Sequence, residues 1–376
     1  MYCHYPTYII EYIPIYIIKL IMRQYFNFTA LNLFNKLNRN NGNIMINIIG
    51  FIKLIAAYSS EYHDNFTEII DNINKSSKLL KVISVYVYNA NSDVIPINNN
   101  DFYTKKIRLE KKKILPSITE RINKWVMILT HGVITDIIRD VKPPQKSRLM
   151  VASDYDLQWT NGFNDIGLDC FYSTHGTKFE FDFMSRTTYD KLEREDNIPN
   201  ETECFITEDY PKYELESVMG EKLRATIVKL PCTTGESMIL YMPNDHKINN
   251  ENFDFIIQNL MKNNGEIFET LLDSFEEVKC DILKIPKFHI TYTDDDVTTD
   301  ISNEIRDSKR KFKVNFVDRI YVNENGIKSK RKKHIKNKCM YNNRNNIKLI
   351  YDKPFLFFVL SKDSYIVDLG IFNSPI

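Results

Sequence analysis

The sequence predicts an α+β fold built around a large, mostly antiparallel sheet. Helical spacing of apolar residues dominates the first third of the chain, and strand-like alternation dominates from about residue 147. The two patterns do not alternate as a parallel βαβ fold requires, and no internal repeat appears. We therefore expect a single domain over residues 26–376, preceded by an extension of uncertain structure over residues 1–25.

Helices are predicted where apolar residues recur every three or four positions. A helix is expected around residues 26–37, a buried helix over 51–58 where the chain is apolar nearly all round, and another over 252–272. The clearest helix begins at Ser117 and Glu120, which form a capping-box pattern, and ends at Gly132, which suits a left-handed C-cap.

Strands are predicted where apolar and polar residues alternate. Val85 and Val87 alternate with tyrosines, and the segment 179–183 alternates phenylalanine with acidic residues. The segments 225–230 and 238–242 flank a short turn that contains Gly235, which predicts a hairpin. Further strands are expected over 282–292, 355–360 and 365–371.

Composition and targeting patterns exclude several classes of protein. Hydrophobic residues make up 43% and charged residues 26% of the 376 residues, and the net charge is +1, so no whole-molecule field attracts nucleic acid or membrane. The apolar N-terminus lacks a basic start and a small-residue cleavage site, and Pro6 and Pro14 interrupt it. We expect no membrane span. A cytoplasmic and a secreted protein both remain open, with a preference for an intracellular one.

No catalytic or metal-binding pattern is present, so we expect neither an enzyme nor a cofactor. The six cysteines share no short spacing and fit reduced thiols, and the histidines lie far apart. Asp294, Asp295 and Asp296 are consecutive, whereas a calcium loop needs alternate spacing.

One long stretch, residues 326–347, has no apolar periodicity and carries a basic run from Lys328 to Lys338. A long loop inside a compact domain is usually functional. Such a run can bind a polyanion or can be a solvated loop, and both interpretations stay open.

Short motifs occur along the chain in residues 29–37 with 42–44, in 122–126 with 132–134, in 159–185, in 230–243, in 285–288, in 353–358 and in 369–375. In this order they resemble the motifs of the serpins, the serine protease inhibitor family. The asparagine-rich and lysine-rich composition is typical of an AT-rich genome, which favours a poxvirus-type member, while an insect or other source remains open.

The resemblance implies three β-sheets, eight or nine helices and an exposed reactive loop at about residues 324–352. In inhibitory serpins a protease cleaves this loop, which then inserts as a new strand of the main sheet. A host serine or cysteine protease is the implied partner of a monomeric inhibitor. The scissile bond would be Met340–Tyr341 or, alternatively, Arg344–Asn345.

The loop hinge departs from the family pattern of short, uncharged residues. Glu324 and Gly326 keep the start of the hinge. In an inserted strand alternate residues share a face, so the inward positions would be Ile327, Ser329, Arg331, Lys333 and Ile335. Arg331 and Lys333 would each bury a cation, at a cost of several kcal/mol if unpaired. Inhibition is therefore in doubt, and a non-inhibitory binding protein is the alternative.

The region where the main sheet opens also departs from the family pattern. By resemblance the family's polar cluster corresponds here to Asn47, Gly50, Val151 and Phe316, which are mostly apolar or small. Trp159 corresponds to a packing tryptophan at the top of the sheet. Replacing hydrogen-bonding partners together by apolar groups can leave stability nearly unchanged. We expect the fold to survive and the opening of the sheet to be altered.

Overall fold

The computed structural model describes most of the chain. The described residues are 15–37, 42–56, 60–76, 80–89, 104–109, 116–132, 134–137, 147–187, 203–207, 213–216, 222–243, 250–279, 282–294, 312–328 and 348–375. The basic run after Lys328 and both expected scissile bonds lie outside them.

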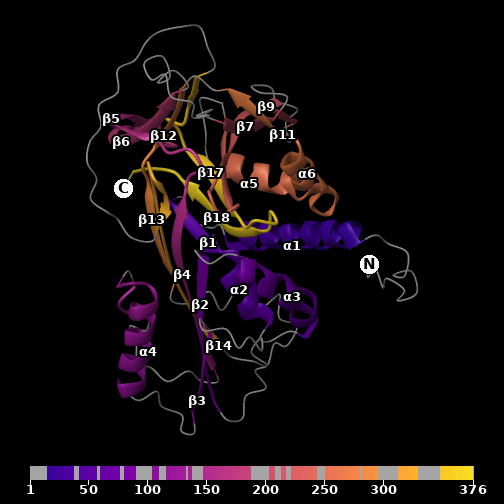
Figure 1. The fold of residues 1–376 in the computed structure, drawn as a ribbon, viewed down its shortest axis with the longest axis vertical. Coiled ribbons are helices and arrows are strands. Elements are labelled where there is room, and N and C mark those ends of the chain that lie inside the picture. Colours follow the sequence, from indigo (N-terminus) through magenta and orange to yellow (C-terminus); the bar gives the residue numbers. More distant parts are fainter. Residues whose placement is uncertain are drawn as a thin grey trace, which may run out of the picture.

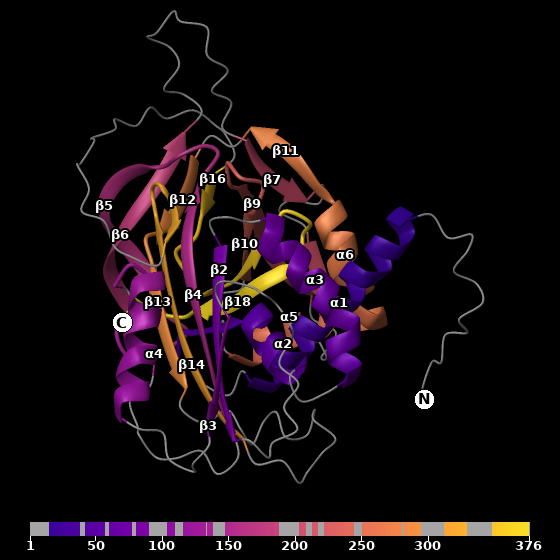
Figure 2. The same ribbon diagram turned by 60° about the horizontal axis from the view of Figure 1, so that its bottom comes forward.

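Three sheets form the body of the protein, as the sequence predicted (Figure 1). The six-stranded sheet has the order β13-β14-β15-β4-β2-β3, and its long strands run side by side (Figure 2). Its strands are β2 (Leu80–Asn89), β3 (Thr104–Leu109), β4 (Ser147–Gln158), β13 (His289–Asp294), β14 (Phe312–Asn323) and β15 (Gly326–Lys328).

The eight-stranded sheet carries most of the apolar core. Its order is β1-β18-β17-β10-β9-β7-β11, with β8 paired to β9. Its strands are β1 (Ile44–Asn47), β7 (Glu203–Thr207), β8 (Tyr213–Glu216), β9 (Lys222–Pro231), β10 (Ser237–Pro243), β11 (Phe275–Lys279), β17 (Phe355–Leu360) and β18 (Ile366–Phe372). The expected hairpin is confirmed, because β9 pairs with β10 around the turn at Gly235.

The four-stranded sheet, β16-β12-β6-β5, lies beside the end of β4 (Figure 2). Its strands are β5 (Asn164–Tyr172), β6 (Lys178–Thr187), β12 (Ile282–Pro286) and β16 (Lys348–Ile350). The expected strand over 282–292 is divided in two: it ends at Pro286, which cannot donate to a ladder, and continues as β13 in a different sheet.

Six helices occur in the described residues, and they cover the sheets from two sides (Figure 1). Helix α4 lies against one face of the six-stranded sheet, where its apolar side joins Ile83, Val85 and Val317 in a separate small core. The other helices lie on the opposite side. The helices are α1 (Ile15–Leu37), α2 (Ile48–Ala56), α3 (Ser60–Ser76), α4 (Pro116–Leu129), α5 (Asn250–Leu260) and α6 (Lys262–Asp273).

The structure differs from the expected helices at three places. Helix α1 begins directly after Pro14, and Tyr25 stacks on Phe66 with ring centroids 5.4 Å apart. Helix α4 begins at Pro116, whose fixed φ suits a first turn, so Ser117 lies inside the helix rather than at its cap. The expected helix over 252–272 is broken between α5 and α6, where Asn263, Asn264 and Gly265 all have positive φ.

The fork in the six-stranded sheet

The candidate functional site is a fork between β4 and β14. At their lower ends the two strands pair directly in parallel, from Phe312 with Ser147 to Val317 with Ala152. At their upper ends they diverge, and the three residues of β15 fill the space between them, antiparallel to both. The sheet therefore already contains the start of a strand that comes from the chain after β14.

Gly326 allows β15 to begin where it does. Its φ is 151°, and a Cβ atom at this position would lie 1.9 Å from the carbonyl oxygen of Leu157. A side chain on residue 326 would therefore force the backbone of β4 and β15 apart. This clash explains sterically why residue 326, at the start of the hinge, is a glycine.

The side chains of β15 alternate as in an inserted strand. Ile327 is fully buried in the main core and pairs with Val322 on one side and Leu157 on the other. Lys328 points to the other face, and its Nζ lies 3.5 Å from the carboxylate of Asp156. Lys328 is only 7% exposed, so the first residue of the basic run is not available to a polyanion in this state.

The turn before β15 is held by backbone and side-chain bonds from the segment after β4. Trp159 Nε1 donates to the carbonyl of Asn323 at 2.8 Å, and its backbone N–H donates to that of Asn325 at 3.1 Å. The N–H of Phe163 donates to the carbonyl of Glu324 at 2.9 Å. Trp159 therefore packs at the top of the sheet and also holds the hinge.

A lysine joins the turn to the four-stranded sheet. Nζ of Lys287 lies 2.9 Å from Oδ1 of Asp165 and 3.1 Å from Oε2 of Glu324. All three side chains are at most 16% exposed, so water screens these ion pairs less than it screens surface pairs. Glu324 was expected from the sequence, whereas the roles of Lys287 and Asp165 were not.

The residues expected where the sheet opens fall into separate roles. Asn47 is the N-cap of α2, because its Oδ1 accepts the N–H of Gly50. Val151 and Phe316 are direct partners in the closed part of the sheet, below the fork. The structure thus brings Val151 and Phe316 together, and it places Trp159 above them at the other side of the fork.

A buried acidic cluster under the fork was missed by the sequence reasoning. Asp318 on β14 and Asp368 on β18 are both fully buried, and Tyr155 on β4 donates a hydrogen bond from its hydroxyl to Oδ2 of Asp368. Burial raises the pKa of Asp368 to about 7, against hydrogen bonds from Tyr155, Asp318 and Asn47 that act in the opposite direction. A signal was available, since Asp368 is an acid within an otherwise apolar strand.

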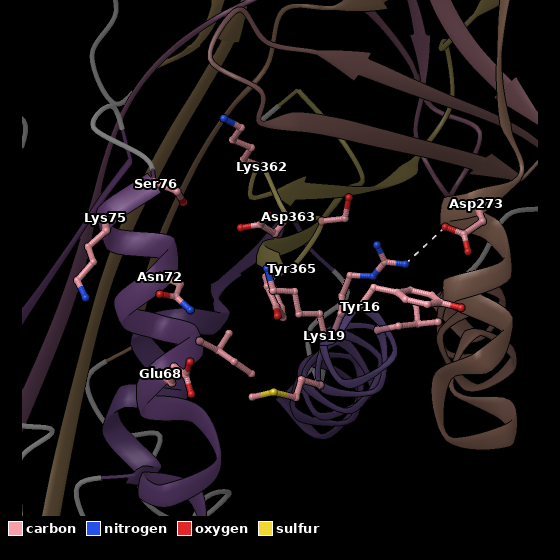
Figure 3. A pocket seen from close by; sticks show the side chains of 15 residues that line it. Tyr16, Lys19, Glu68, Asn72, Lys75, Ser76, Asp273, Lys362, Asp363 and Tyr365 are labelled. Carbon is pink, nitrogen blue, oxygen red and sulfur yellow. Dashed lines mark hydrogen bonds and ion pairs between the residues drawn. The ribbon is translucent and has the colours of Figure 1, made fainter. Parts of the chain in front are cut away.

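A hollow of about 900 Å³ lies between α1, α3, α6 and the turn that precedes β18 (Figure 3). Lysines and acids from these elements surround it, and Arg23 Nη2 lies 3.5 Å from Asp273. Tyr16 and Leu20 on its rim are exposed. The mixed charges do not select a ligand of either sign, and the hollow lies on the far side of the core from the fork.

A further potentially reactive group among the described residues is the thiol of Cys232. Cys232 is buried, and desolvation raises the pKa of its thiol to about 12, which makes it unreactive at neutral pH.

No helix among the described residues has the length and apolar character needed to cross a membrane.

The six-stranded sheet thus holds the short strand β15 between its two longer neighbours β4 and β14. A sequence model of the family described as "Serpin (serine protease inhibitor)" matches residues 29–300. This match covers more than half of the chain, so the protein belongs to the serpin family.

Solved serpin structures share the fold at low sequence identity. A complex of thyroxine-binding globulin with thyroxine has a TM-score of 0.68 at 14% identity, over 95% of this chain and 99% of the other. Native protease nexin-1 with heparin has 0.68 at 15% identity, over 95% and 100%. Native tengpin, a thermophilic serpin, has 0.67 at 16% identity, over 94% of both chains. No curated protein was found to match the sequence.

Proposed function

We propose that this protein inhibits serine-type endopeptidases by offering its loop, at about residues 324–352, as bait and then inserting that loop into the six-stranded sheet. The observation that carries the proposal is the position of β15 between β4 and β14. Ile327 is inward and buried, and Lys328 is outward, which is the alternation that further insertion would continue.

The register of β15 supplies the partners of each residue that would follow. Extended along both neighbours, it brings Ser329 opposite Ile320 and Tyr155. It then brings Arg331 opposite Asp318 and Ser153, and Lys333 opposite Phe316 and Val151. Two inward cations placed inhibition in doubt. Of these, Arg331 comes opposite a buried acid, whereas Lys333 comes opposite apolar residues.

Mixing the protein with trypsin-like, chymotrypsin-like and papain-like proteases tests the proposal. An inhibitor forms an SDS-stable complex with at least one of them after cleavage near Met340–Tyr341 or Arg344–Asn345. Ser329→Arg, at the first inward position beyond β15, should abolish the complex and leave only loop cleavage, because a cation would enter beside Ile320 and Tyr155. Lys328→Arg, on the outward face of the same strand, should keep it. Simple cleavage of the wild-type loop by every protease would refute inhibition.

The second candidate is a non-inhibitory serpin whose basic loop binds a host partner or a polyanion. Lys333 favours it, since the apolar neighbours at its inserted position offer no counter-charge. A related observation is that protease nexin-1 has been solved with heparin. Heparin affinity that falls steeply with salt, together with loop cleavage that leaves thermal stability unchanged, would support this function.

A further inference from the structure

The two arms of the fork are joined from beneath by one hydrogen-bonded group of side chains. Direct pairing of β14 with β4 ends at Val317 and Ala152, below β15. Asp318 follows Val317 on β14, and Tyr155 lies on β4 beyond Ala152. Both make hydrogen bonds to the carboxyl group of Asp368 on β18 of the eight-stranded sheet. Asp368 therefore links β4 and β14 where these strands no longer pair with each other.

The bond between the two acids contains a proton. A carboxylate can only accept hydrogen bonds, so two carboxyl groups bond to each other only when one of them is protonated. Asp318 and Asp368 are both fully buried, where a pair of negative charges is poorly screened. Burial raises the pKa of Asp368 to about 7, against the opposing effect of its hydrogen bonds. Below this pH the acids are bonded, and above it they repel each other.

The other bonds to Asp368 do not depend on its proton. Tyr155 on β4 donates from its hydroxyl, and Asn47 on β1 can donate from its amide, to a charged or a neutral carboxyl group. Helix α2, which also packs against β18, carries the buried cation Lys53. Within the bonded group, the pH-sensitive link is therefore the one from Asp368 to Asp318, that is, to β14.

We propose that Tyr155, Asp368 and Asp318 form a proton-dependent latch, which joins β4 to β14 beneath the fork when it is protonated and releases β14 when it is charged. The latch acts in the intact protein, so it stands whether or not the loop is later inserted. Under the proposed function it restrains the opening of the sheet in acidic surroundings and lets the loop enter at higher pH.

Hydrogen exchange measures the opening of each strand in the full-length protein. Backbone amide exchange of β14 is compared at pH 5 and pH 8, after correction for the effect of pH on an unfolded peptide. We expect the corrected rate in β14 to be on the order of tenfold higher at pH 8, the factor that corresponds to one unit of pKa. β10, in the middle of the eight-stranded sheet, should change by less than about twofold.

Asp318→Asn replaces the shared proton by a permanent donor. Its amide can donate to Asp368 at every pH, so the corrected exchange of β14 should remain slow at pH 8, within about twofold of its value at pH 5. Asp156→Asn is the matched control, because Asp156 is an acid next to Tyr155 whose side chain is 57% exposed. This control should keep the pH dependence of the wild type.

Infrared spectroscopy tests the proton without any substitution. The C=O stretching band of a protonated, buried carboxyl group should disappear from the wild-type spectrum as the pH rises through about 7. In Asp318→Asn the band should disappear at a lower pH, because a permanent donor favours the charged form of Asp368. If this variant does not fold, exchange and infrared titration of the wild type decide the question.

The outcomes separate the latch from the proposed function. Exchange of β14 that is independent of pH in the wild type would overturn the latch, as would a pH dependence that Asp318→Asn retains. A wild type without a carboxyl band that titrates near pH 7 would overturn it as well. Each of these results leaves the proposed inhibition standing, because none of the measurements uses a protease or a cleaved loop.

Discussion

Gly326 shows how one residue decides whether a strand can start inside a sheet. Its Cβ would overlap the Leu157 carbonyl, and its φ lies where other residues are strained. We expect Gly326→Ala to lower the free energy of unfolding by about 1–3 kcal/mol, because the backbone must shift or β15 must leave the sheet. Urea unfolding measures this change.

Gly42 provides the matched control for this prediction. No atom lies within 4 Å of a Cβ added at Gly42. Gly42→Ala should therefore change stability by less than about 0.5 kcal/mol. Equal effects of the two substitutions would show that Gly326 is not sterically required.

Asp368 should make stability depend on pH in a direction opposite to that of most acids. Its pKa is raised from 3.8 to about 7 in the folded protein, so between these values the folded state holds a proton that the unfolded state has released. The unfolded state binds fewer protons there, and stability falls as pH rises, by up to about 1.4 kcal/mol per pH unit. Above about pH 7 this contribution becomes constant.

Asp368→Asn tests this dependence by removing the titrating group while keeping an acceptor for Tyr155. The groups that face it are Tyr155, Asp318 and Asn47. We expect unfolding free energies measured from pH 4 to pH 8 to decline less in the variant than in the wild type. Glu266→Gln, an exposed change on α6, should leave the wild-type slope unchanged. If Asp368→Asn shows the same pH dependence as the wild type, the raised pKa of Asp368 is contradicted.

At the scale of elements, the turn between β14 and β15 depends on its ion pairs with Lys287. Lys287→Met would leave Glu324 and Asp165, at most 15% exposed, without their cation. We expect a loss of about 2–3 kcal/mol in the free energy of unfolding. Asp156→Asn should cost less than about 1 kcal/mol, because Asp156 is 57% exposed and its ion pair with Lys328 is 3.5 Å long. A double-mutant cycle of Lys287 with Glu324 that shows no coupling would contradict the assignment.

Most elements could be predicted because their periodicity reflects one buried face. The alternation around Val85 and the apolar run that became α2 both carry that signal, and the structure confirms both elements. The break at Asn263 and the change of sheet after Pro286 depend on packing partners far away in the chain, which local periodicity does not encode.

The site was predictable only where residues resemble family motifs. Trp159 and Glu324 were found in this way. Asp318 and Asp368 are 50 positions apart in sequence and lie on strands of two different sheets, yet their side chains are hydrogen-bonded. An acid in an apolar strand marks an exception, but the sequence does not show what that acid faces. Asn47 was expected at the opening from the family resemblance, and its side chain both caps α2 and faces Asp368.

At the scale of the whole molecule, the position of β15 predicts how cleavage of the loop changes stability. The six-stranded sheet already contains Gly326–Lys328 between β4 and β14. Under the proposed function, cleavage lets the residues that follow continue this strand, which adds backbone hydrogen bonds to both neighbours. The loop-cleaved protein should therefore be more stable than the intact protein.

Melting temperatures of intact and loop-cleaved protein measure this gain. We expect the loop-cleaved form to melt about 5 °C or more above the intact form, although 1 kcal/mol corresponds to only about 1 °C in a chain of this size. Lys333→Gln should enlarge the difference, because Lys333 would otherwise enter opposite Phe316 and Val151 without a counter-charge. Equal melting temperatures of the intact and cleaved wild-type protein would contradict insertion.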